Sequence, residues 1–249
     1  QEIIVLFTND IHCAMDENIG FAGLAAYRNA CKEKTPYVTL VDCGDAIQGS
    51  TLGAVSRGRY AVTLMNEIGY DFAVLGNHEF DFGMECLSEH MKNAKAQYLG
   101  CNIRYTGDGE TALDSLKPYD IISYGETDVA FIGVSTPEST VSSTPSYFME
   151  DGSFVYDFYA GEDGSLLYAC VQGYVDECRS LGADYVILLT HLGDEESASP
   201  YTSVELIEHT QGVDAVLDGH AHHEIPCSVK PNKAGKEALL SSTGTGMEN

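Results

Sequence analysis

Short apolar runs alternate with longer amphipathic segments along most of this chain, and this alternation limits the possible folds more than any other feature. Such a rhythm is typical of βαβ units in an α/β domain. The predicted strands span residues 3–8, 37–42, 71–75, 97–101, 119–124, 128–134, 184–190, 213–217 and 237–241. The predicted helices span 20–34, 82–95, 165–181 and 203–210. Since 44% of the 249 residues are hydrophobic, the chain can bury a sizeable core.

Two segments depart from the alternation. The runs 119–124 and 127–134 have no helix between them, which predicts a hairpin across Gly125 and Glu126 and disfavours a purely parallel sheet. Segment 136–164 is rich in Ser, Thr, Pro, Gly and acidic residues, so we expect a long surface excursion with a short strand at 153–159. No internal repeat or domain linker is recognisable.

The charge balance excludes several function classes. Thirteen Lys and Arg against 38 Asp and Glu give a formal net charge of −25. This balance disfavours binding to nucleic acids or to anionic lipid surfaces. No run approaches the roughly 20 apolar residues that a membrane span requires. The chain starts on a strand-like run, 3–7, and shows no signal peptide, which leaves an exported origin open.

The eight cysteines form no CxxC pair, so a thiolate zinc site is not expected. An even count permits disulfides, but we expect most of these residues to be buried free thiols. Cys13 and Cys43 adjoin polar candidate residues and should therefore face away from them and pack into the core.

Five predicted strands end in the same way: an apolar run stops, and residue types that bind metals follow at once. The five segments are Leu6–His12, Thr39–Asp45, Val74–Glu79, Leu188–His191 and Val216–His222. In open α/β sheets, binding sites form beyond the carboxyl ends of the strands. We therefore expect these five polar segments to converge on one face of the molecule.

The candidate metal ligands are Asp10, His12, Asp45, Asn77, His191, His220 and His222. Alternate residues of an extended segment point the same way, so Asp10 can act with His12 at one site. Seven side chains are too many ligands for one ion, but they suit two ions that share a bridging carboxylate. Asp45 is the natural candidate for that bridge. Imidazole and carboxylate ligands without thiolate favour two divalent ions of Zn, Mn, Fe, Co or Ni over Mg or Ca.

Each piece taken alone has an ordinary structural explanation. A single His at a strand end is usually a hydrogen-bonded loop residue, and Gly-Asp or Gly-Asn is usually a turn. Asp218 is explained equally well as a brace for its own turn. The coincidence of five such strand ends is what favours a dinuclear metal site.

The motifs resemble, in this order, those of the calcineurin-like metallophosphoesterases. The motifs are Gly44-Asp45, Gly76-Asn77-His78-Glu79, Thr190-His191 and Gly219-His220-Ala221-His222. The run 77–81 is typical of the bacterial 5′-nucleotidase branch, which includes UDP-sugar hydrolases and 2′,3′-cyclic nucleotide phosphodiesterases. The resemblance extends from Thr8 to Gly246 and implies a four-layer α/β/β/α sandwich of two mixed sheets.

The resemblance also implies roles for individual residues. One metal would be held by Asp10, His12, Asp45 and His222, although close relatives have Gln at the position of His222. The other metal would be held by Asp45, Asn77, His191 and His220. His78 and Asp81 match a catalytic pair, and Asn77 and His78 would contact the substrate. An alternative role for Asp81 is to cap the helix predicted at 82–95.

Family members continue into a second domain that recognises the nucleoside, so residues 1–249 would be the catalytic domain alone. The expected activity is hydrolysis of a small-molecule nucleotide to nucleoside and phosphate. The alternatives are hydrolysis of a 2′,3′-cyclic nucleotide, of a UDP-sugar or of a sulfur ester, and, in another class, a metal-stabilised binding module without turnover. The resemblance implies an extracellular, cell-wall or periplasmic location.

Overall fold

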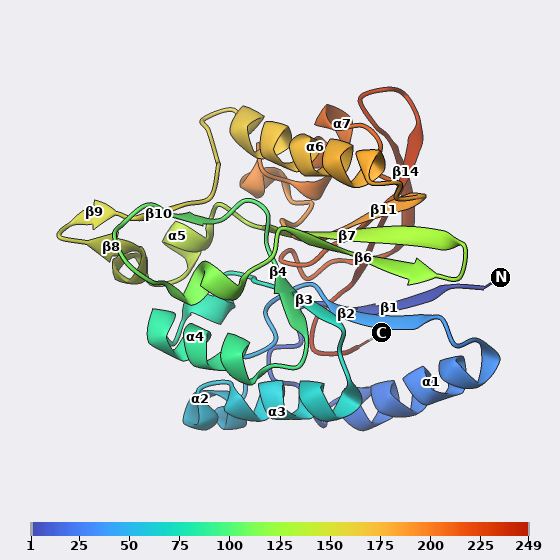
Figure 1. The fold of residues 1–249 in the computed structure, drawn as a ribbon. Helices are drawn as coiled ribbons and strands as arrows, with labels where there is room; N and C mark the ends of the chain where they lie inside the picture. The colour runs from blue at the N-terminus through green and yellow to red at the C-terminus, as the bar shows by residue number, and fades with distance from the viewer. Residues whose placement is uncertain (1, 249) are drawn as a thin grey trace.

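Two β-sheets lie face to face, and helices cover the outer face of each sheet (Figure 1). The computed structural model describes residues 2–248. The layers follow the order helix, sheet, sheet, helix, with α1, α3 and α4 on one side and α6 and α7 on the other (Figure 1). This architecture confirms the α/β fold class and the four layers that the sequence predicted.

The first sheet has the strand order β1-β2-β3-β4 and is parallel in each of its described pairs. Its strands are β1 (Ile4–Thr8), β2 (Val38–Asp42), β3 (Phe72–Val74) and β4 (Gln97–Leu99). Its helices are α1 (Gly20–Lys34), α2 (Thr51–Ser56), α3 (Arg59–Ile68) and α4 (Met84–Asn93). Because a helical crossover connects each strand to the next, this sheet is parallel rather than mixed, which corrects that part of the expectation.

The second sheet has the order β13-β14-β12-β11-β7-β6 and is mixed. Its strands are β6 (Tyr119–Tyr124), β7 (Thr127–Ser135), β11 (Tyr185–His191), β12 (Ala215–Leu217), β13 (Glu224–Pro231) and β14 (Glu237–Thr243). The predicted hairpin is confirmed as the antiparallel pair β6–β7. The outer helices are α6 (Ser165–Ser180) and α7 (Ser203–His209), and α7 begins with the expected capping box of Thr202 and Glu205.

Among the elements of six or more residues, three were missing from the sequence-based expectations: α2, α3 and β13. Gly58 and Gly69 flank α3 in left-handed conformations and confine its apolar face to a few residues. Strand β13 lies at the edge of its sheet, contains Pro226 and Pro231, and is mostly exposed, so it lacks a clear apolar alternation. Proline is tolerated at sheet edges because the N–H it removes there has no ladder partner.

The excursion after β7 holds α5 (Ser139–Ser142) and contributes β8, β9 and β10 to two small ribbons. One ribbon pairs β5 (Arg104–Tyr105) with β10 (Tyr156–Asp157), and the other pairs β8 (Met149–Glu150) with β9 (Ser153–Phe154). The single strand expected at 153–159 is therefore two short strands in different ribbons. Among the described residues, none of the helices has both the length and the apolar composition needed to cross a bilayer.

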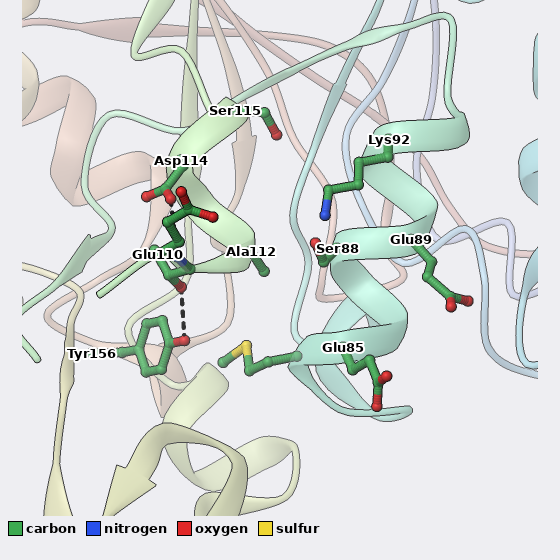
Figure 2. Close-up of a pocket in the computed structure, with 11 residues that line it drawn as sticks. Glu85, Ser88, Glu89, Lys92, Glu110, Ala112, Asp114, Ser115 and Tyr156 are labelled. Atoms are coloured by element: carbon green, nitrogen blue, oxygen red, sulfur yellow. Dashed lines mark hydrogen bonds between the residues drawn. The ribbon is translucent and has the colours of Figure 1, made fainter. Parts of the chain in front are cut away.

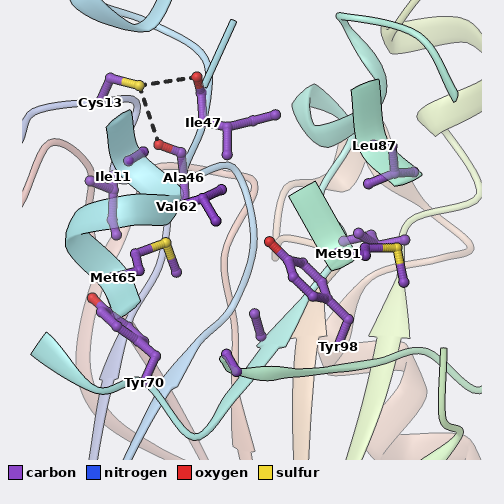
Figure 3. Packing of buried hydrophobic residues seen from close by; sticks show 14 of the residues in the cluster. Ile11, Cys13, Ala46, Ile47, Val62, Met65, Tyr70, Leu87, Met91 and Tyr98 are labelled. Atoms are coloured by element: carbon purple, nitrogen blue, oxygen red, sulfur yellow. Dashed lines mark hydrogen bonds between the residues drawn. The ribbon is translucent and has the colours of Figure 1, made fainter. Parts of the chain in front are cut away.

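The core has three parts: one beneath each helical layer and one between the sheets. In the part beneath the first helices, Val62 and Met65 of α3 lie on the same side as Ile47, while Met91 and Tyr98 approach from the other side (Figure 3). All eight cysteines are free, and six of them are buried, as expected.

The two cysteines next to candidate ligands pack away from the site. Cys13 donates through Sγ to the Ile47 carbonyl at 3.0 Å within the first core cluster (Figure 3). Cys43 lies in the cluster between the sheets, and its Sγ donates to the Leu217 carbonyl at 3.3 Å.

Replacing Phe131 with Ala tests the packing between the sheets. The Phe131 side chain is fully buried, and its ring centroid lies 5.2 Å from that of Phe72. The cavity left by the substitution should lower the free energy of unfolding by roughly 3–5 kcal/mol, measured by urea denaturation at fixed metal concentration. Leu181→Ala, at a side chain that is 61% exposed, is the control and should cost less than about 0.5 kcal/mol. Equal effects of the two substitutions would contradict this role for Phe131.

Candidate metal centre

The carboxyl ends of strands from both sheets meet at one edge of the sandwich. Asp10, Asp45, Asn77, His191 and His220 each lie within three residues of the last residue of β1, β2, β3, β11 and β12, respectively. Two groups of side chains offer ligand atoms that lie within 4.8 Å of one another: Asp10, His12 and His222 in one, and Asp45, His191 and His220 in the other. The structure thus brings together six of the seven predicted ligands in two groups.

Asp45 connects the two groups. Its Oδ2 lies 3.1 Å from Nε2 of His191 in its own group and 4.0 Å from Nε2 of His12 in the other. Asp10 has a similar position, since its Oδ1 lies 3.3 Å from His222 Nε2 and 3.9 Å from His191 Nε2. Both carboxylates are almost completely buried, so each is held within reach of imidazoles from both sheets.

Three buried polar atoms at this edge have no hydrogen-bond partner: Asp10 Oδ1, Asn77 Oδ1 and His191 Nε2. Buried polar atoms are normally hydrogen-bonded, and these are a carboxylate oxygen, an amide oxygen and an imidazole nitrogen. All three are metal-ligand atoms on residues that the sequence selected as ligands. The donor set therefore fits divalent cations of the zinc or manganese kind.

Second hydrogen bonds fix the orientation of two imidazoles. His191 donates through Nδ1 to the Cys43 carbonyl at 2.7 Å. His12 donates through Nδ1 to the Gln48 carbonyl at 3.1 Å. With a proton on Nδ1, each ring directs Nε2 toward the buried carboxylates. Metal-ligating histidines are commonly oriented by such a second contact.

The backbone is strained at most of these positions. Positive φ angles occur at Asp10 (48°), His12 (47°), Asp45 (60°), His220 (87°) and His222 (58°). Residues other than glycine rarely adopt this region, and such strain gathers at functional sites where the surroundings hold it. Glycine makes the close approach possible, because a Cβ on Gly76 would lie 2.2 Å from Asp45 Oδ1.

Glu79 supports the loop that carries Asp45, a role that the sequence did not reveal. Its buried carboxylate accepts hydrogen bonds from the backbone N–H groups of Asp45 (2.8 Å), Ala46 (2.9 Å) and Gly76 (2.7 Å). Burial, together with the charge of Asp45, raises the pKa of Glu79 to about 7. The only sequence signal was its place in the run 77–81.

Asn9 and Asp218 brace other parts of the same edge. Asn9 donates to Asp10 Oδ2 at 2.7 Å and to the Gly244 carbonyl at 2.8 Å, so it ties the end of β1 to the segment after β14. Asp218 accepts from the Thr190 hydroxyl at 2.6 Å and from the Leu192 N–H at 3.0 Å. The expectation that Asp218 braces its own turn is corrected, because its carboxylate braces the neighbouring strand end instead.

The buried carboxylates require positive charge beside them. Burial disfavours the charged form of Asp45, but the neighbouring histidines, His191 above all, together outweigh burial and place the pKa of Asp45 below its ordinary value. Burial likewise disfavours the charged form of His191, yet Asp45 and Asp10 raise its pKa well above the ordinary value. A divalent cation bound here would supply the same positive charge and release the proton.

His78 and Asp81 form the expected pair. His78 begins the 3₁₀ turn His78–Phe80, and its Nδ1 lies 2.6 Å from Asp81 Oδ2. The hydrogen bond to Asp81 raises the pKa of His78. The His78 backbone N–H donates to Asp45 Oδ1 at 2.8 Å, which ties the pair to the buried carboxylates.

Asp81 does not cap the following helix. Helix α4 begins after Gly83, which makes no side-chain capping bond. The second oxygen of Asp81, Oδ1, instead accepts from the hydroxyl of Ser143 at 2.9 Å. The alternative role for Asp81 is therefore wrong.

The excursion after β7 reaches the site in two places. Ser143 contacts Asp81, as described, and Glu138 Oε2 lies 3.3 Å from His220 Nε2. Sequence reasoning placed no site residue in 136–164, and this polar segment shows no motif or periodicity that would have identified these two.

A separate cavity of about 720 Å³ lies between α4 and the 3₁₀ turn Ala112–Ser115 (Figure 2). Figure 2 shows Ser88 and Lys92 on the side of α4 toward the turn that carries Asp114 and Ser115, while Glu85 and Glu89 extend away from that turn. Tyr156 closes one end through a 2.9 Å hydrogen bond between its hydroxyl and that of Thr111. No candidate ligand lines this cavity, so it is distinct from the metal centre.

Together, the layers and the cluster at the strand ends define the metallophosphoesterase fold. The model of the calcineurin-like phosphoesterase family matches residues 3–224, and the chain belongs to that family. The chain is 30% identical to a snake venom 5′-nucleotidase of Naja atra over 236 residues, which cover 89% of this chain and 41% of the relative. It is 28% identical to the 5′-nucleotidase of Bos taurus over 266 residues, covering 99% and 43%.

Among solved structures, the NAD nucleotidase of Haemophilus influenzae superposes with a TM-score of 0.80 at 22% identity, covering 98% of this chain and 45% of that protein. This similarity supports the fold. The chain spans about two fifths of the length of the curated relatives it matches.

Replacing Gly76 with Ala tests the close packing beneath Asp45. The new Cβ would collide with Asp45 Oδ1 and with the Asp45 backbone nitrogen 2.7 Å away, so it should displace the carboxylate from its position between the two groups. Affinity for Mn²⁺ or Zn²⁺, measured by titration calorimetry, should fall by at least about tenfold. Gly173→Ala in α6 is the control, because nothing lies within 4 Å of its added Cβ. Unchanged metal affinity in Gly76→Ala would refute this interpretation.

Proposed function

We propose that this chain is the catalytic domain of a dinuclear-metal phosphoester hydrolase that releases phosphate from nucleotides. One observation carries the proposal: two groups of metal-ligand side chains lie beside a His–Asp pair at one edge of the sandwich. The 5′-nucleotidase relatives support the nucleotide as the substrate class. Because those relatives are longer than this chain, nucleoside recognition is assigned to residues outside it.

The proposed metal assignment follows the two groups. One ion would be held by Asp10, His12, Asp45 and His222, and the other by Asp45, Asn77, His191 and His220. The unpartnered oxygen of Asn77 supports its inclusion, since an amide oxygen ligates a metal without adding charge. Two such ions supply Lewis-acid stabilisation of a phosphate and lower the pKa of a bound water.

The protein residues set the charge of the centre. Asp10 and Asp45 are the two acids among the proposed ligands, and they neutralise only part of the charge of two divalent ions. A net charge of about +2 remains, which suits a phosphate dianion. Asn77 and the histidines leave this balance unchanged because neutral amide and imidazole groups are the metal-binding forms.

His78 acts on the leaving oxygen, the oxygen that separates from phosphorus when the ester is cleaved. Asp81 holds Nδ1 of the ring and favours its protonated form, and this leaves Nε2 available to the substrate. The side chain is 29% exposed, so it is accessible from the solvent side of the buried carboxylates. His78 would therefore stabilise negative charge or donate a proton as the ester bond breaks.

The His–Asp pair also separates this proposal from a binding module without turnover. Holding metal ions requires the two ligand groups but does not require a hydrogen-bonded pair beside them. The 2.6 Å contact between His78 and Asp81 therefore favours an enzyme.

A substrate panel tests the proposed activity. The full-length protein and this chain would each be given AMP, 2′,3′-cyclic AMP, UDP-glucose and a chromogenic phosphate monoester, with and without added Mn²⁺. We expect metal-dependent phosphate release from AMP by the full-length protein. Binding of two metal ions without hydrolysis of any ester would overturn the proposal.

We extend the proposal to an extracellular, cell-wall or periplasmic location. The venom relative supports export, since its name places it in a secretion. Fractionation of the source cells with an antibody against this chain tests the location, and detection in the cytosolic fraction alone would contradict it.

Replacing His78 with Ala tests the catalytic role. Two bound ions per chain should remain, because His78 is not among the proposed ligands. Turnover of AMP should fall by about 10²–10⁴-fold, the range for loss of a positioned acid or base. His209→Ala, at an exposed histidine in α7, is the control and should stay within about twofold of the parent. Full activity in His78→Ala, with metal content measured by elemental analysis, would refute the role.

A further inference from the structure

The carboxylate of Asp81 is held at both oxygens, and the two partners come from distant parts of the chain. Oδ2 lies 2.6 Å from His78 Nδ1, three residues earlier. Oδ1 accepts from the Ser143 hydroxyl at 2.9 Å, across a separation of 62 residues. A carboxylate with one bonded oxygen can rotate and exchange its oxygens, whereas one held at both oxygens is fixed in plane and direction.

The segment that carries Ser143 is itself anchored. The backbone N–H of Ser143 donates to the Ser139 carbonyl at 3.2 Å, and the buried Ser139 hydroxyl donates to the Thr136 carbonyl at 2.8 Å. On the same segment, Glu138 contacts His220 at 3.3 Å. Ser143 is therefore presented from a short element that starts at the end of β7 and touches the site at a second point.

We propose that Ser143 is a positioning residue that fixes the Asp81 carboxylate and, through it, the ring of His78. The proposal rests on the proposed function, because it assigns Ser143 to the alignment of the same His–Asp pair. Without the hydroxyl, Asp81 loses one of its two contacts and the His78 ring samples orientations away from the reacting phosphate. Ser143 is not among the proposed metal ligands, and we expect it to act through Asp81, to which its hydroxyl donates.

The test compares variants of the full-length protein with AMP as substrate. Ser143→Ala should lower kcat about tenfold, the cost of one hydrogen bond to a charged group, with KM changed less than about twofold. Ser143→Thr keeps the hydroxyl and should retain most of the parent activity. Ser142→Ala is the matched control, because Ser142 is exposed and its hydroxyl donates to the carbonyl of Glu138, the N-cap residue of its own helix.

A double-mutant cycle distinguishes positioning from general destabilisation. In an Asp81→Ala background, replacing Ser143 with Ala should have no further effect on kcat, because the carboxylate through which it acts is gone. A readout independent of turnover is the NMR signal of the proton shared by His78 and Asp81. That signal should shift or broaden in Ser143→Ala and remain unchanged in Ser142→Ala.

Two outcomes would overturn the inference. The first is that Ser143→Ala matches Ser142→Ala in kcat and in the NMR signal. The second is that its effect persists undiminished in the Asp81→Ala background. If Ser143→Ala does not fold, Ser143→Cys keeps the volume with a weak donor and gives the same comparison. Parent protein that turns over no ester would instead count against the proposed function, and the NMR comparison would still decide the role of Ser143.

Discussion

Two carboxylates, those of Asp10 and Asp45, are buried within reach of the same His191 imidazole, and the rest of the site depends on this arrangement. Buried charges are tolerated only where opposite charge and hydrogen bonds offset the loss of water. The unusual features nearby follow from that requirement. The left-handed backbone at Asp10 and Asp45 aims the carboxylates inward, and Gly76 leaves room for one of them. Positive charge between the two side chains, whether a proton on His191 or a divalent ion, is what makes the geometry favourable.

The two sheets explain how residues so distant in sequence come together. Asp45 and Asn77 follow parallel neighbours in one sheet, while His191 and His220 follow parallel neighbours in the other. Parallel strands have all their carboxyl ends at one edge of the sheet, so in each sheet the polar turns that follow the strands lie in a row along that edge. Because the two sheets pack face to face, the two rows of polar turns are in contact, and Phe72 and Phe131 fill the space between the sheets. The packing of the apolar core between the sheets therefore also determines how the polar turns come together at the edge.

The sequence predicted most of the fold and selected seven candidate ligands, six of which the structure brings together in two groups, because each candidate follows an apolar run that marks a strand. It did not predict β13, because the prolines and the exposure of this strand leave no clear alternation of apolar and polar residues. It also did not predict the contacts of Glu138 and Ser143. Those two residues lie in a polar excursion where neither hydrophobic period nor motif restricts the side chains. Their roles arise only from tertiary placement, since each meets a partner more than 60 residues away. Glu79 is an intermediate case, present in a recognised run but given its supporting role only by three backbone contacts.

The net charge of −25 has a specific consequence for the choice of substrate. None of the candidate ligands or the His–Asp pair is a lysine or an arginine, so in the proposed function the positive charge for a phosphate would come from two divalent cations and from His78. Such charge is concentrated at one point and acts strongly at short range, whereas the acidic remainder of the chain repels extended polyanions. A compact phosphate ester is attracted by the concentrated positive charge and is little affected by repulsion from the acidic remainder of the chain. The acidic composition therefore disfavours nucleic acid chains while leaving the centre open to small phosphate esters such as single nucleotides.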